Sequence, residues 1–199
     1  EQHRLIRLLW PPFANTRREP GYIKAYPPGI RENGGQYSHA AAWLGMAFAE
    51  LGDAEGAWRI FQLMNPIHQA DSPERLARYR VEPYVLAADI GSVAPHCGRG
   101  GWTWYSGSAA WTWRLAIESI LGLRLREGRL AITPCLPPGW PGFSAQIQGE
   151  QGALRIVVAK ITSTEAGWPR TTLNGQPLLE ETVAFPRDGS TAEVRIWLY

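Results

Sequence analysis

The stretch GYIKAYPPGIRENGGQYSH, residues 21–39, carries much of the polar chemistry of this chain and leads directly into a strong helical pattern. Its Pro27-Pro28-Gly29 and Gly34-Gly35 steps combine fixed φ angles with positions that tolerate positive φ, a mixture that regular helices and strands do not accommodate. We therefore expect a shaped loop. Its side chains include several that bind sugars and anions: Lys24, Arg31, Glu32, Tyr37 and His39. The alternative is a polar surface loop whose glycines only turn the chain.

The composition is that of a globular protein. Of 199 residues, 45% are hydrophobic and 19% are charged, and the formal net charge is +2. This near-neutral balance argues against a nucleic-acid-binding surface. No apolar run approaches the ~20 residues of a membrane helix, and no signal peptide is recognisable. The ten tryptophans suit a buried core or the stacking platforms of sugar sites.

The two cysteines indicate a cellular compartment, and the first residues indicate whether the chain is part of a longer protein. Cys97 and Cys135 could pair, but so sparse a count is typical of a reduced, intracellular protein. The chain begins without Met, at residues 2–10 that already follow a helical pattern and are stopped by Pro11-Pro12. We therefore expect a piece of a longer protein.

Helical patterns dominate the first part of the chain. Apolar positions recur at helical spacing over residues 40–51, Gly52 ends that helix, and Asp53 caps the next, which Asn65-Pro66 stops. Residues 66–83 read as irregular, with an N-cap signal at Ser72. Such a helical pair leaves apolar faces to be covered by further helices, so we expect Trp43, Phe48 and Phe61 to be exposed.

A second glycine-rich loop, residues 91–108, precedes a helix predicted over residues 109–123. Ser106-Gly107-Ser108 then lies at the N-terminus of this helix, where unpaired backbone N–H groups favour an anion. A simple N-cap by Ser106 or Ser108 is the alternative, and both roles remain open.

The pattern changes to short alternating strands after residue 123. Residues 153–161 and 192–198 alternate, and Asn174-Gly175 predicts a tight hairpin. We expect helices over residues 1–123 and a β-sandwich over residues 124–199, with the proline-rich residues 134–143 as the link.

Four motifs together resemble glycoside hydrolase family 94, and within it the C-terminal phosphorylase-like module of cyclic β-1,2-glucan synthases. They are GYIKAYPPGIRENGGQYSHAAAW, RYRVEPYVLAADI, GRGGWTWYSGSAAW and ITPCLPPGWPGF. The resemblance implies an α+β multidomain protein: the last helices of an (α/α)6 barrel in residues 1–123, then the β-sandwich. It also implies inverting phosphorolysis of β-glucosides, in which phosphate attacks the anomeric carbon and an Asp protonates the leaving oxygen. That Asp is expected upstream of residue 1.

The resemblance assigns roles residue by residue. Glu32 of the ENGG motif would bind sugar hydroxyls, and Arg31 and Tyr37 belong to the same substrate-binding set. His39 would contact phosphate, together with Ser106-Gly107, where Ser stands in place of the family's Thr. Ala25 stands where the family pattern has Gly.

Other roles for these residues stay open at the level of sequence. Glu32 could brace its loop, and His39 could be a structural histidine at a helix start. Trp102 and Trp104 suit core packing as well as a sugar platform. A metal site built on His96 and Cys97 fits no zinc spacing, so no metal is expected.

Two classes of function remain. The first is part of a glycoside phosphorylase or glucan synthase, with inorganic phosphate as co-substrate and no other cofactor. The expected partners are a β-glucan, inorganic phosphate and the rest of a parent chain. The resemblance allows a homodimer, and no nucleic acid is expected. The second class is a non-catalytic carbohydrate-binding remnant. Either is expected in the cytoplasm, or as the cytoplasmic part of a membrane-embedded synthase.

Overall fold

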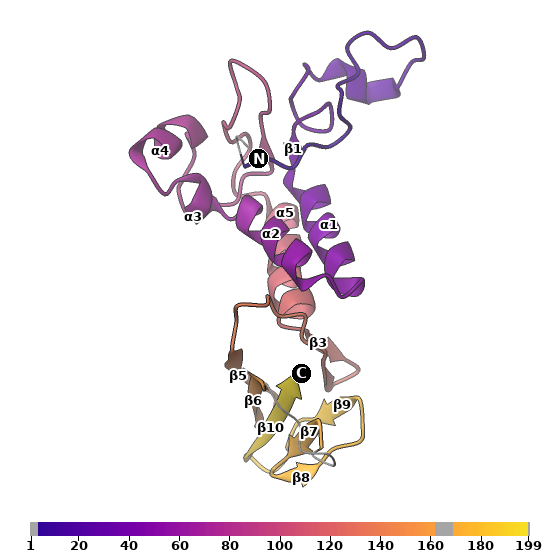
Figure 1. The fold of residues 1–199 in the computed structure, drawn as a ribbon, viewed down its shortest axis with the longest axis vertical. Helices are drawn as coiled ribbons and strands as arrows, with labels where there is room; N and C mark the ends of the chain where they lie inside the picture. The colour runs from indigo at the N-terminus through magenta and orange to yellow at the C-terminus, as the bar shows by residue number, and fades with distance from the viewer. Residues whose placement is uncertain (1–3, 162–168, 199) are drawn as a thin grey trace. The chain divides into compact units, whose positions relative to one another are not determined.

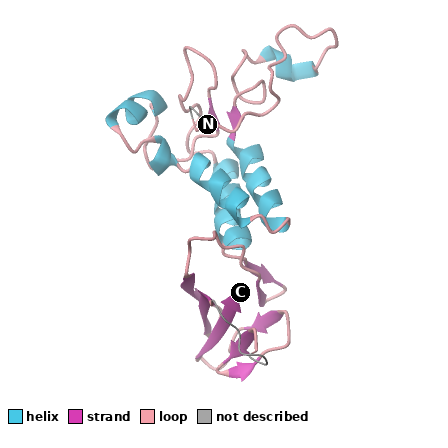
Figure 2. Cartoon of the chain, viewed as in Figure 1, coloured by secondary structure: helices cyan, strands magenta, loops and turns pink. Residues whose placement is uncertain are grey.

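A computed structural model describes residues 4–161 and 169–198 of the chain. The chain divides into two compact units, Glu1–Ile120 and Leu121–Tyr199. Helices belong to the first unit and the longer strands to the second (Figure 1 and Figure 2). The chain is therefore a mixed α and β protein, as the sequence predicts.

Two helices form a hairpin in the first unit. Helix α1 spans Ser38–Glu50 and α2 spans Ala54–Met64, which confirms the predicted pair. Gly52 adopts a φ of 76° in the turn between them. The Asp53 carboxylate accepts a hydrogen bond of 2.8 Å from the Gly56 N–H, the cap that the sequence predicts.

A third helix packs on this hairpin. Helix α5 spans Ser106–Arg114 and continues as the π-helical segment η2, Leu115–Ile120. It begins before the predicted residue 109 and ends before the predicted residue 123. The three helices enclose two apolar clusters, and Phe48 packs against both. The buried members are Ala41, Ala42, Ile60 and Met64 in one cluster and Ala57, Leu115 and Ile120 in the other.

The prediction of a helix over residues 2–10 was wrong for the described residues 4–10, which are not helical. Residues 1–3 lie outside the described part. The Leu8 N–H donates to the Gly35 carbonyl at 2.8 Å, and the Leu8 carbonyl accepts from the Gly34 N–H at 2.9 Å. A short segment ahead of two prolines makes few helical hydrogen bonds, so pairing with the loop replaces them.

Short helices occur where irregular chain was predicted. They are the 3-10 helix η1 Gly21–Ala25, α3 Pro66–Gln69 and α4 Pro73–Tyr79. Proline stands at the start of α3 and of α4, where its missing N–H costs nothing. The Ser72 hydroxyl caps α4 by accepting from the Arg75 N–H at 3.3 Å, which confirms that N-cap signal.

Two sheets build the second unit within the described residues. One has the order β5-β6-β10-β7-β8 and the other β3-β4-β9. Strands β6 and β10 are parallel and bury Leu154, Ile156 and Val194. The predicted Asn174-Gly175 turn joins β7 to β8, with φ angles of 49° and 80°. The strand bounds are β3 Leu123–Arg126, β4 Arg129–Ile132, β5 Gly142–Gln148, β6 Ala153–Lys160, β7 Thr171–Leu173, β8 Gln176–Pro177, β9 Thr182–Ala184 and β10 Thr191–Leu198.

The remaining features concern membrane helices and thiols. Among the described residues, none of the helices has both the length and the apolar character needed to cross a membrane. Cys97 is a free thiol, and both Cys97 and Cys135 are partly buried.

Candidate functional site

A short antiparallel pair joins the two glycine-rich loops. Strand β1, Gln36–Tyr37, pairs with β2, Asp89–Ile90, so that Tyr37 lies opposite Asp89. The Ser38 N–H extends the pairing by donating to the Ala88 carbonyl at 2.9 Å. The loop over residues 21–39 therefore contains a 3-10 helix and a strand, which the sequence did not predict. Both loops are anchored at the start of α1.

Buried polar groups shape the first loop. The Asn33 side chain is 1% exposed; its Oδ1 accepts from the Phe13 N–H at 2.6 Å and its Nδ2 donates to the Tyr26 carbonyl at 2.8 Å. The Ser92 hydroxyl, from the second loop, donates to the Gly34 carbonyl at 2.6 Å. Because buried backbone groups need partners, these bonds fix the ENGG turn against the second loop.

Arg31 and Glu32 form an ion pair within this turn. The Nε atom of Arg31 lies 3.6 Å from Oε2 of Glu32, and the two side chains are only 21% and 15% exposed. The guanidinium lies over the rings of Tyr26, Tyr37 and Trp102, with centroid distances of 5.3, 5.6 and 5.6 Å. Arg31 itself has a positive φ of 47°. The turn thus presents a cation and a carboxylate within an aromatic setting.

Asp89 is the residue that sequence reasoning missed. It is 5% exposed, and its Oδ1 lies 3.4 Å from the Trp102 N–H that donates to it. A Cβ at Gly101 would lie 2.4 Å from the same oxygen, so only glycine lets the second loop approach this closely. The sequence does contain a signal for Asp89. Its carboxylate directly follows the apolar residues 85–88 and precedes a glycine-rich loop.

The charges of Arg31, Glu32 and Asp89 interact. Burial raises the pKa of Asp89; the Trp102 N–H and the Arg31 charge oppose that rise, and Glu32 adds to it. Burial by itself would lower the pKa of Arg31, but Tyr26, Glu32 and Asp89 outweigh it and raise that pKa. The Arg31 guanidinium thus interacts with the carboxylates of Glu32 and Asp89. These three side chains offer a ligand both hydrogen-bond donors and hydrogen-bond acceptors.

His39 lies in an aromatic cluster at the start of α1. Its ring stacks on Tyr37 and Trp111, with centroids 6.1 and 5.6 Å apart, and meets the edge of Trp43 at 4.7 Å. The Nε2 atom of His39 is buried and has no hydrogen-bond partner among the described residues. Because a buried polar atom without a partner is costly, this atom is a candidate for binding a ligand.

The start of α5 lies beside His39. A Cβ built on Gly107 would stand 4.0 Å from Nδ1 of His39 and meet no other atom nearer. Neither predicted serine cap forms among the described residues: Tyr105 is the N-cap without a side-chain bond, and the Ser108 hydroxyl donates to the Tyr105 carbonyl at 3.2 Å. Ser106 is exposed. The first turn therefore keeps unpaired N–H groups, which favour an anion.

The tryptophans of the second loop are exposed. Trp102 is 60% exposed and Trp104 is 71% exposed, and the Trp104 Nε1 donates to Glu82 at 3.1 Å. Core packing, one of the two roles open for this pair, is therefore wrong, and Trp102 remains available as a sugar platform. Over residues 4–161 and 169–198, no three His, Cys, Asp or Glu side chains form a group able to hold a metal ion.

The comparisons with known proteins match the part of the chain that contains this candidate site. The model of the Glycosyl hydrolase 94 superfamily, catalytic domain, matches residues 1–122. The chain is 50% identical over 173 residues to the cyclic beta-(1,2)-glucan synthase NdvB of Rhizobium meliloti, covering 87% of this chain and 6% of that protein. It is 29% identical over 174 residues to the N,N'-diacetylchitobiose phosphorylase of Vibrio proteolyticus, covering 87% of this chain and 21% of that enzyme.

A further relative has a shorter match. The chain is 27% identical over 132 residues to the 1,2-beta-oligoglucan phosphorylase of Listeria innocua, covering 59% of this chain and 12% of that enzyme. The chain thus spans a small part of the length of these relatives. Because the family model matches well over half of its residues, the chain belongs to the Glycosyl hydrolase 94 superfamily.

Proposed function

We propose that this chain supplies the sugar- and phosphate-binding part of a site for inverting phosphorolysis of β-glucosides. A phosphate oxygen attacks the anomeric carbon, the glycosidic bond breaks, and a general acid gives its proton to the leaving oxygen. Attack from the opposite face inverts the anomeric centre, so a β-glucoside yields α-glucose 1-phosphate. Inorganic phosphate is the co-substrate, and the reaction as written needs no other cofactor.

The observation that carries the proposal is the position of His39 beside the start of α5. The Nε2 atom of His39 is buried and unpartnered, its Nδ1 atom lies 4.0 Å from a Cβ built on Gly107, and the first turn of α5 has no side-chain cap. A phosphate there would accept hydrogen bonds from the imidazole, from the Ser106 hydroxyl and from backbone N–H groups. Tyr37, stacked on His39, connects this region to the ENGG turn.

The sugar is proposed to lie against Arg31, Glu32 and Asp89. Carboxylates accept hydrogen bonds from sugar hydroxyls, and a guanidinium donates to ring and hydroxyl oxygens. The exposed face of Trp102 would contact the apolar face of a pyranose. Glu32 also pairs with Arg31 at 3.6 Å, so a sugar hydroxyl there would have an acceptor and a donor side by side.

The general acid is proposed to be an Asp outside these 199 residues. An inverting phosphorylase needs one acid, since phosphate replaces the base-activated water of a hydrolase. Helices α1, α2 and α5 would then belong to the last part of an (α/α)6 barrel, and the second unit would form a β-sandwich. A cytoplasmic location is part of the proposal, supported by the sparse count of two cysteines in 199 residues.

The proposed substrate is a β-1,2-linked glucan. Two relatives are named for β-1,2-glucans, a cyclic β-1,2-glucan synthase and a 1,2-β-oligoglucan phosphorylase. The higher identity to the first supports this linkage over the chitobiose specificity in the name of the Vibrio enzyme.

The test is an assay for glucose 1-phosphate with β-1,2-gluco-oligosaccharides and phosphate. A longer protein that carries this sequence should release glucose 1-phosphate only when phosphate is present. The isolated chain should release none, because general-acid help is worth roughly 10²- to 10⁴-fold in rate. Release by the isolated chain would contradict the external acid, and oligosaccharide binding without turnover in the longer protein would identify a non-catalytic binding module.

A further inference from the structure

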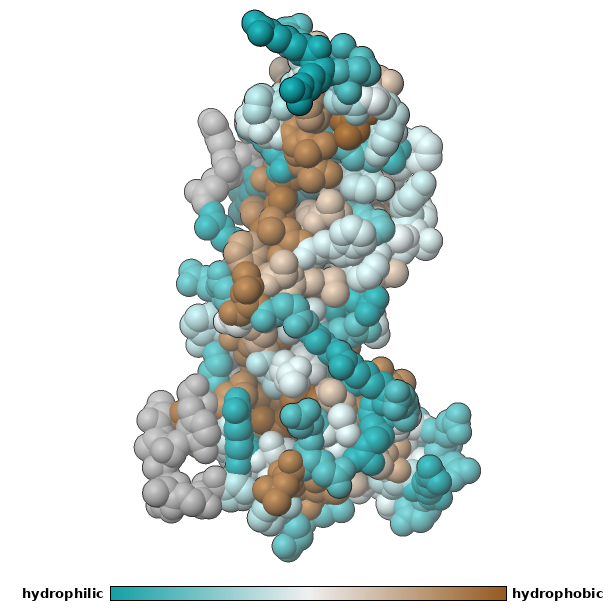
Figure 3. Space-filling view, turned by 90° about the vertical axis from the view of Figure 1, so that its right-hand side faces the viewer, coloured by the Kyte–Doolittle hydropathy of each residue, from teal (hydrophilic) through white to brown (hydrophobic). Residues whose placement is uncertain are grey.

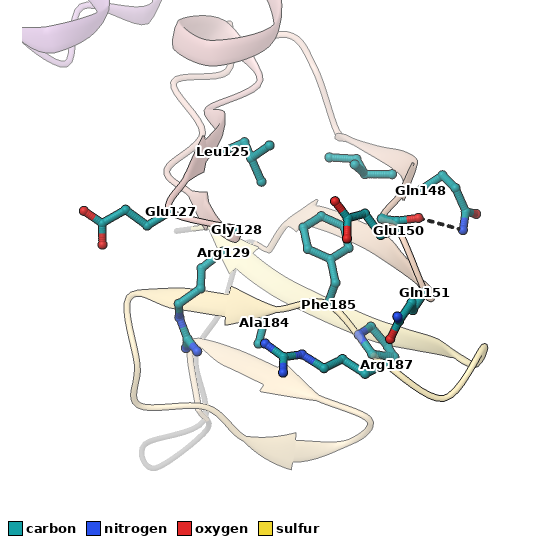
Figure 4. Close-up of a pocket in the computed structure, with 13 residues that line it drawn as sticks. Leu125, Glu127, Gly128, Arg129, Gln148, Glu150, Gln151, Ala184, Phe185 and Arg187 are labelled. Atoms are coloured by element: carbon teal, nitrogen blue, oxygen red, sulfur yellow. Dashed lines mark hydrogen bonds between the residues drawn. The ribbon is translucent and has the colours of Figure 1, made fainter.

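The second unit contains a pocket of about 920 Å³, and none of the residues assigned above lines it. Three connections surround it: the β3–β4 turn, the β5–β6 turn and the segment that follows β9. Figure 4 shows Leu125, Phe185 and Glu150 projecting toward the hollow, whereas Glu127 points away from it. All of its lining residues belong to the unit Leu121–Tyr199.

We propose that this pocket is an accessory binding site for a β-linked gluco-oligosaccharide. The choice of sugar rests on the function proposed above. The pocket itself is argued from its apolar centre and its unpaired polar rim.

An aromatic ring forms the apolar centre. Phe185 packs on the backbone of the β5–β6 turn, since a Cβ at Gly149 would lie 2.7 Å from Cδ1 of the ring. A Cβ at Gly152 would likewise lie 2.6 Å from the Pro186 carbonyl oxygen. Gly149 thus allows the ring to lie directly against the turn, and Gly152 allows the same for the backbone of Pro186. Leu125 adds a large apolar side chain that is 66% exposed.

The polar rim has free charges of both signs. Glu150 and Arg187 are exposed, and neither side chain makes a hydrogen bond or ion pair with the described residues. Arg129 differs, because its Nε donates to the Thr182 hydroxyl at 2.7 Å and its guanidinium pairs with Glu180. The rim therefore offers one free carboxylate and one free guanidinium.

This arrangement suits an uncharged polyol better than an ion. One carboxylate and one guanidinium have no net charge, so neither an anion nor a cation gains a large electrostatic attraction. A pyranose combines an apolar C–H face, which stacks on an aromatic ring, with hydroxyls that both donate and accept hydrogen bonds. Phe185 with Glu150, Gln151 and Arg187 provides partners for both parts.

The experiment follows the backbone amide resonances of the 199-residue chain by NMR during titration with a linear β-1,2-gluco-oligosaccharide. We expect shifts in residues 149–152 and 185–187. Phe185→Ala should weaken this binding about fivefold, which corresponds to the roughly 1 kcal/mol that an aromatic contact contributes. Arg187→Ala, at an exposed position where folding is not at risk, should weaken it as well.

Matched variants separate this site from the first. Leu179→Ala, at a residue 97% exposed in the same unit and outside the pocket, should leave binding unchanged. Glu32→Gln should also leave the shifts in residues 149–152 unchanged. Shifts confined to residues 31–39 and 102 would overturn the accessory site while leaving the proposed function intact. No shift in residues 149–152 and 185–187 would overturn the pocket, and so would equal binding by wild type, Phe185→Ala and Arg187→Ala. The proposed function is tested separately, by turnover in the longer protein.

Discussion

Tyr37 and Asp89 are direct partners in the antiparallel β1–β2 pair, and this pairing brings the two glycine-rich loops together. The pair places the buried carboxylate of Asp89 near Arg31 and Glu32, beside the N–H of Trp102. Asp89 is thus both a junction of the two loops and a charged member of the candidate sugar site.

The raised pKa of Asp89 predicts a specific pH dependence of stability. Its folded-state pKa lies above the ordinary 3.8, because burial disfavours the charged form. The folded state therefore binds the proton more tightly than the unfolded state, and the associated stability is lost as pH rises through the folded pKa. Relative to Asp89→Asn, the wild type should lose stability as pH rises from below the ordinary pKa of 3.8 through the raised folded-state pKa, measured by denaturant unfolding.

A second carboxylate in the same unit gives the opposite sign. Hydrogen bonds from Arg75 and Arg4 lower the pKa of Asp71, the Arg75 bond being the larger cause. Relative to Asp71→Asn, the wild type should gain stability as pH rises from the lowered folded-state pKa to the ordinary pKa of 3.8, and the difference should be constant above that pH. If the difference in unfolding free energy between wild type and Asp89→Asn did not change with pH, the Asp89 carboxylate would not be held in a buried setting.

The hydroxyl of Tyr79 holds the segment that leads to Asp89. It donates to the Val85 carbonyl at 3.0 Å and accepts from the Ala87 N–H at 3.2 Å, and burial raises the pKa of Tyr79 to about 12. Tyr79→Phe leaves both buried backbone groups unpaired and should cost about 1–3 kcal/mol of unfolding free energy. Tyr84→Phe, at a side chain 70% exposed, is the control and should have little effect. Equal stability of the two variants would contradict this role.

Several elements of both units could be predicted from local sequence chemistry. Helices α1 and α2, the caps at Asp53 and Ser72, and the Asn174-Gly175 hairpin each depend on a few adjacent residues. Residues 4–10 and the parallel β6–β10 pair could not be predicted, because partners distant in sequence determine them. Asp89 was missed for the same reason: only the pairing with Tyr37 brings it to Arg31.

The apolar surface of the helical unit predicts self-association. Trp43 and Leu44 of α1 and Leu51 at its C-cap are 52%, 42% and 82% exposed, and hydrophobic residues gather on the side where α1 lies (Figure 3). The expectation that Phe48 and Phe61 are exposed was wrong, because both pack against the core. Light scattering should detect oligomers of the isolated chain, since large apolar patches drive association.

Charged substitutions test this surface. Leu44→Lys with Leu51→Lys should reduce the association of the chain, whereas Leu179→Lys in the second unit should not. A monodisperse wild-type monomer with cooperative unfolding would contradict the prediction.

Glu32 should affect the sugar more than phosphate. Glu32→Gln keeps the size of the side chain but removes its charge and its ion pair with Arg31. In a longer protein that carries this sequence, KM for the β-glucan should rise about tenfold or more, because hydrogen bonds to charged groups contribute roughly 1.5–3 kcal/mol. Initial rates at varied sugar and fixed saturating phosphate measure this effect. A change confined to KM for phosphate would contradict the assigned role.

The phosphate site is the central claim, and steady-state kinetics with varied phosphate test it most directly. In the longer protein, His39→Ala and Ser106→Ala should each raise KM for phosphate, or lower kcat/KM, roughly ten- to hundredfold, as expected for the loss of one charge-assisted hydrogen bond. Ser106→Thr keeps the hydroxyl and should be neutral or mildly favourable. Wild-type phosphate kinetics in both correctly folded alanine variants would contradict the account and make His39 and Ser106 structural residues.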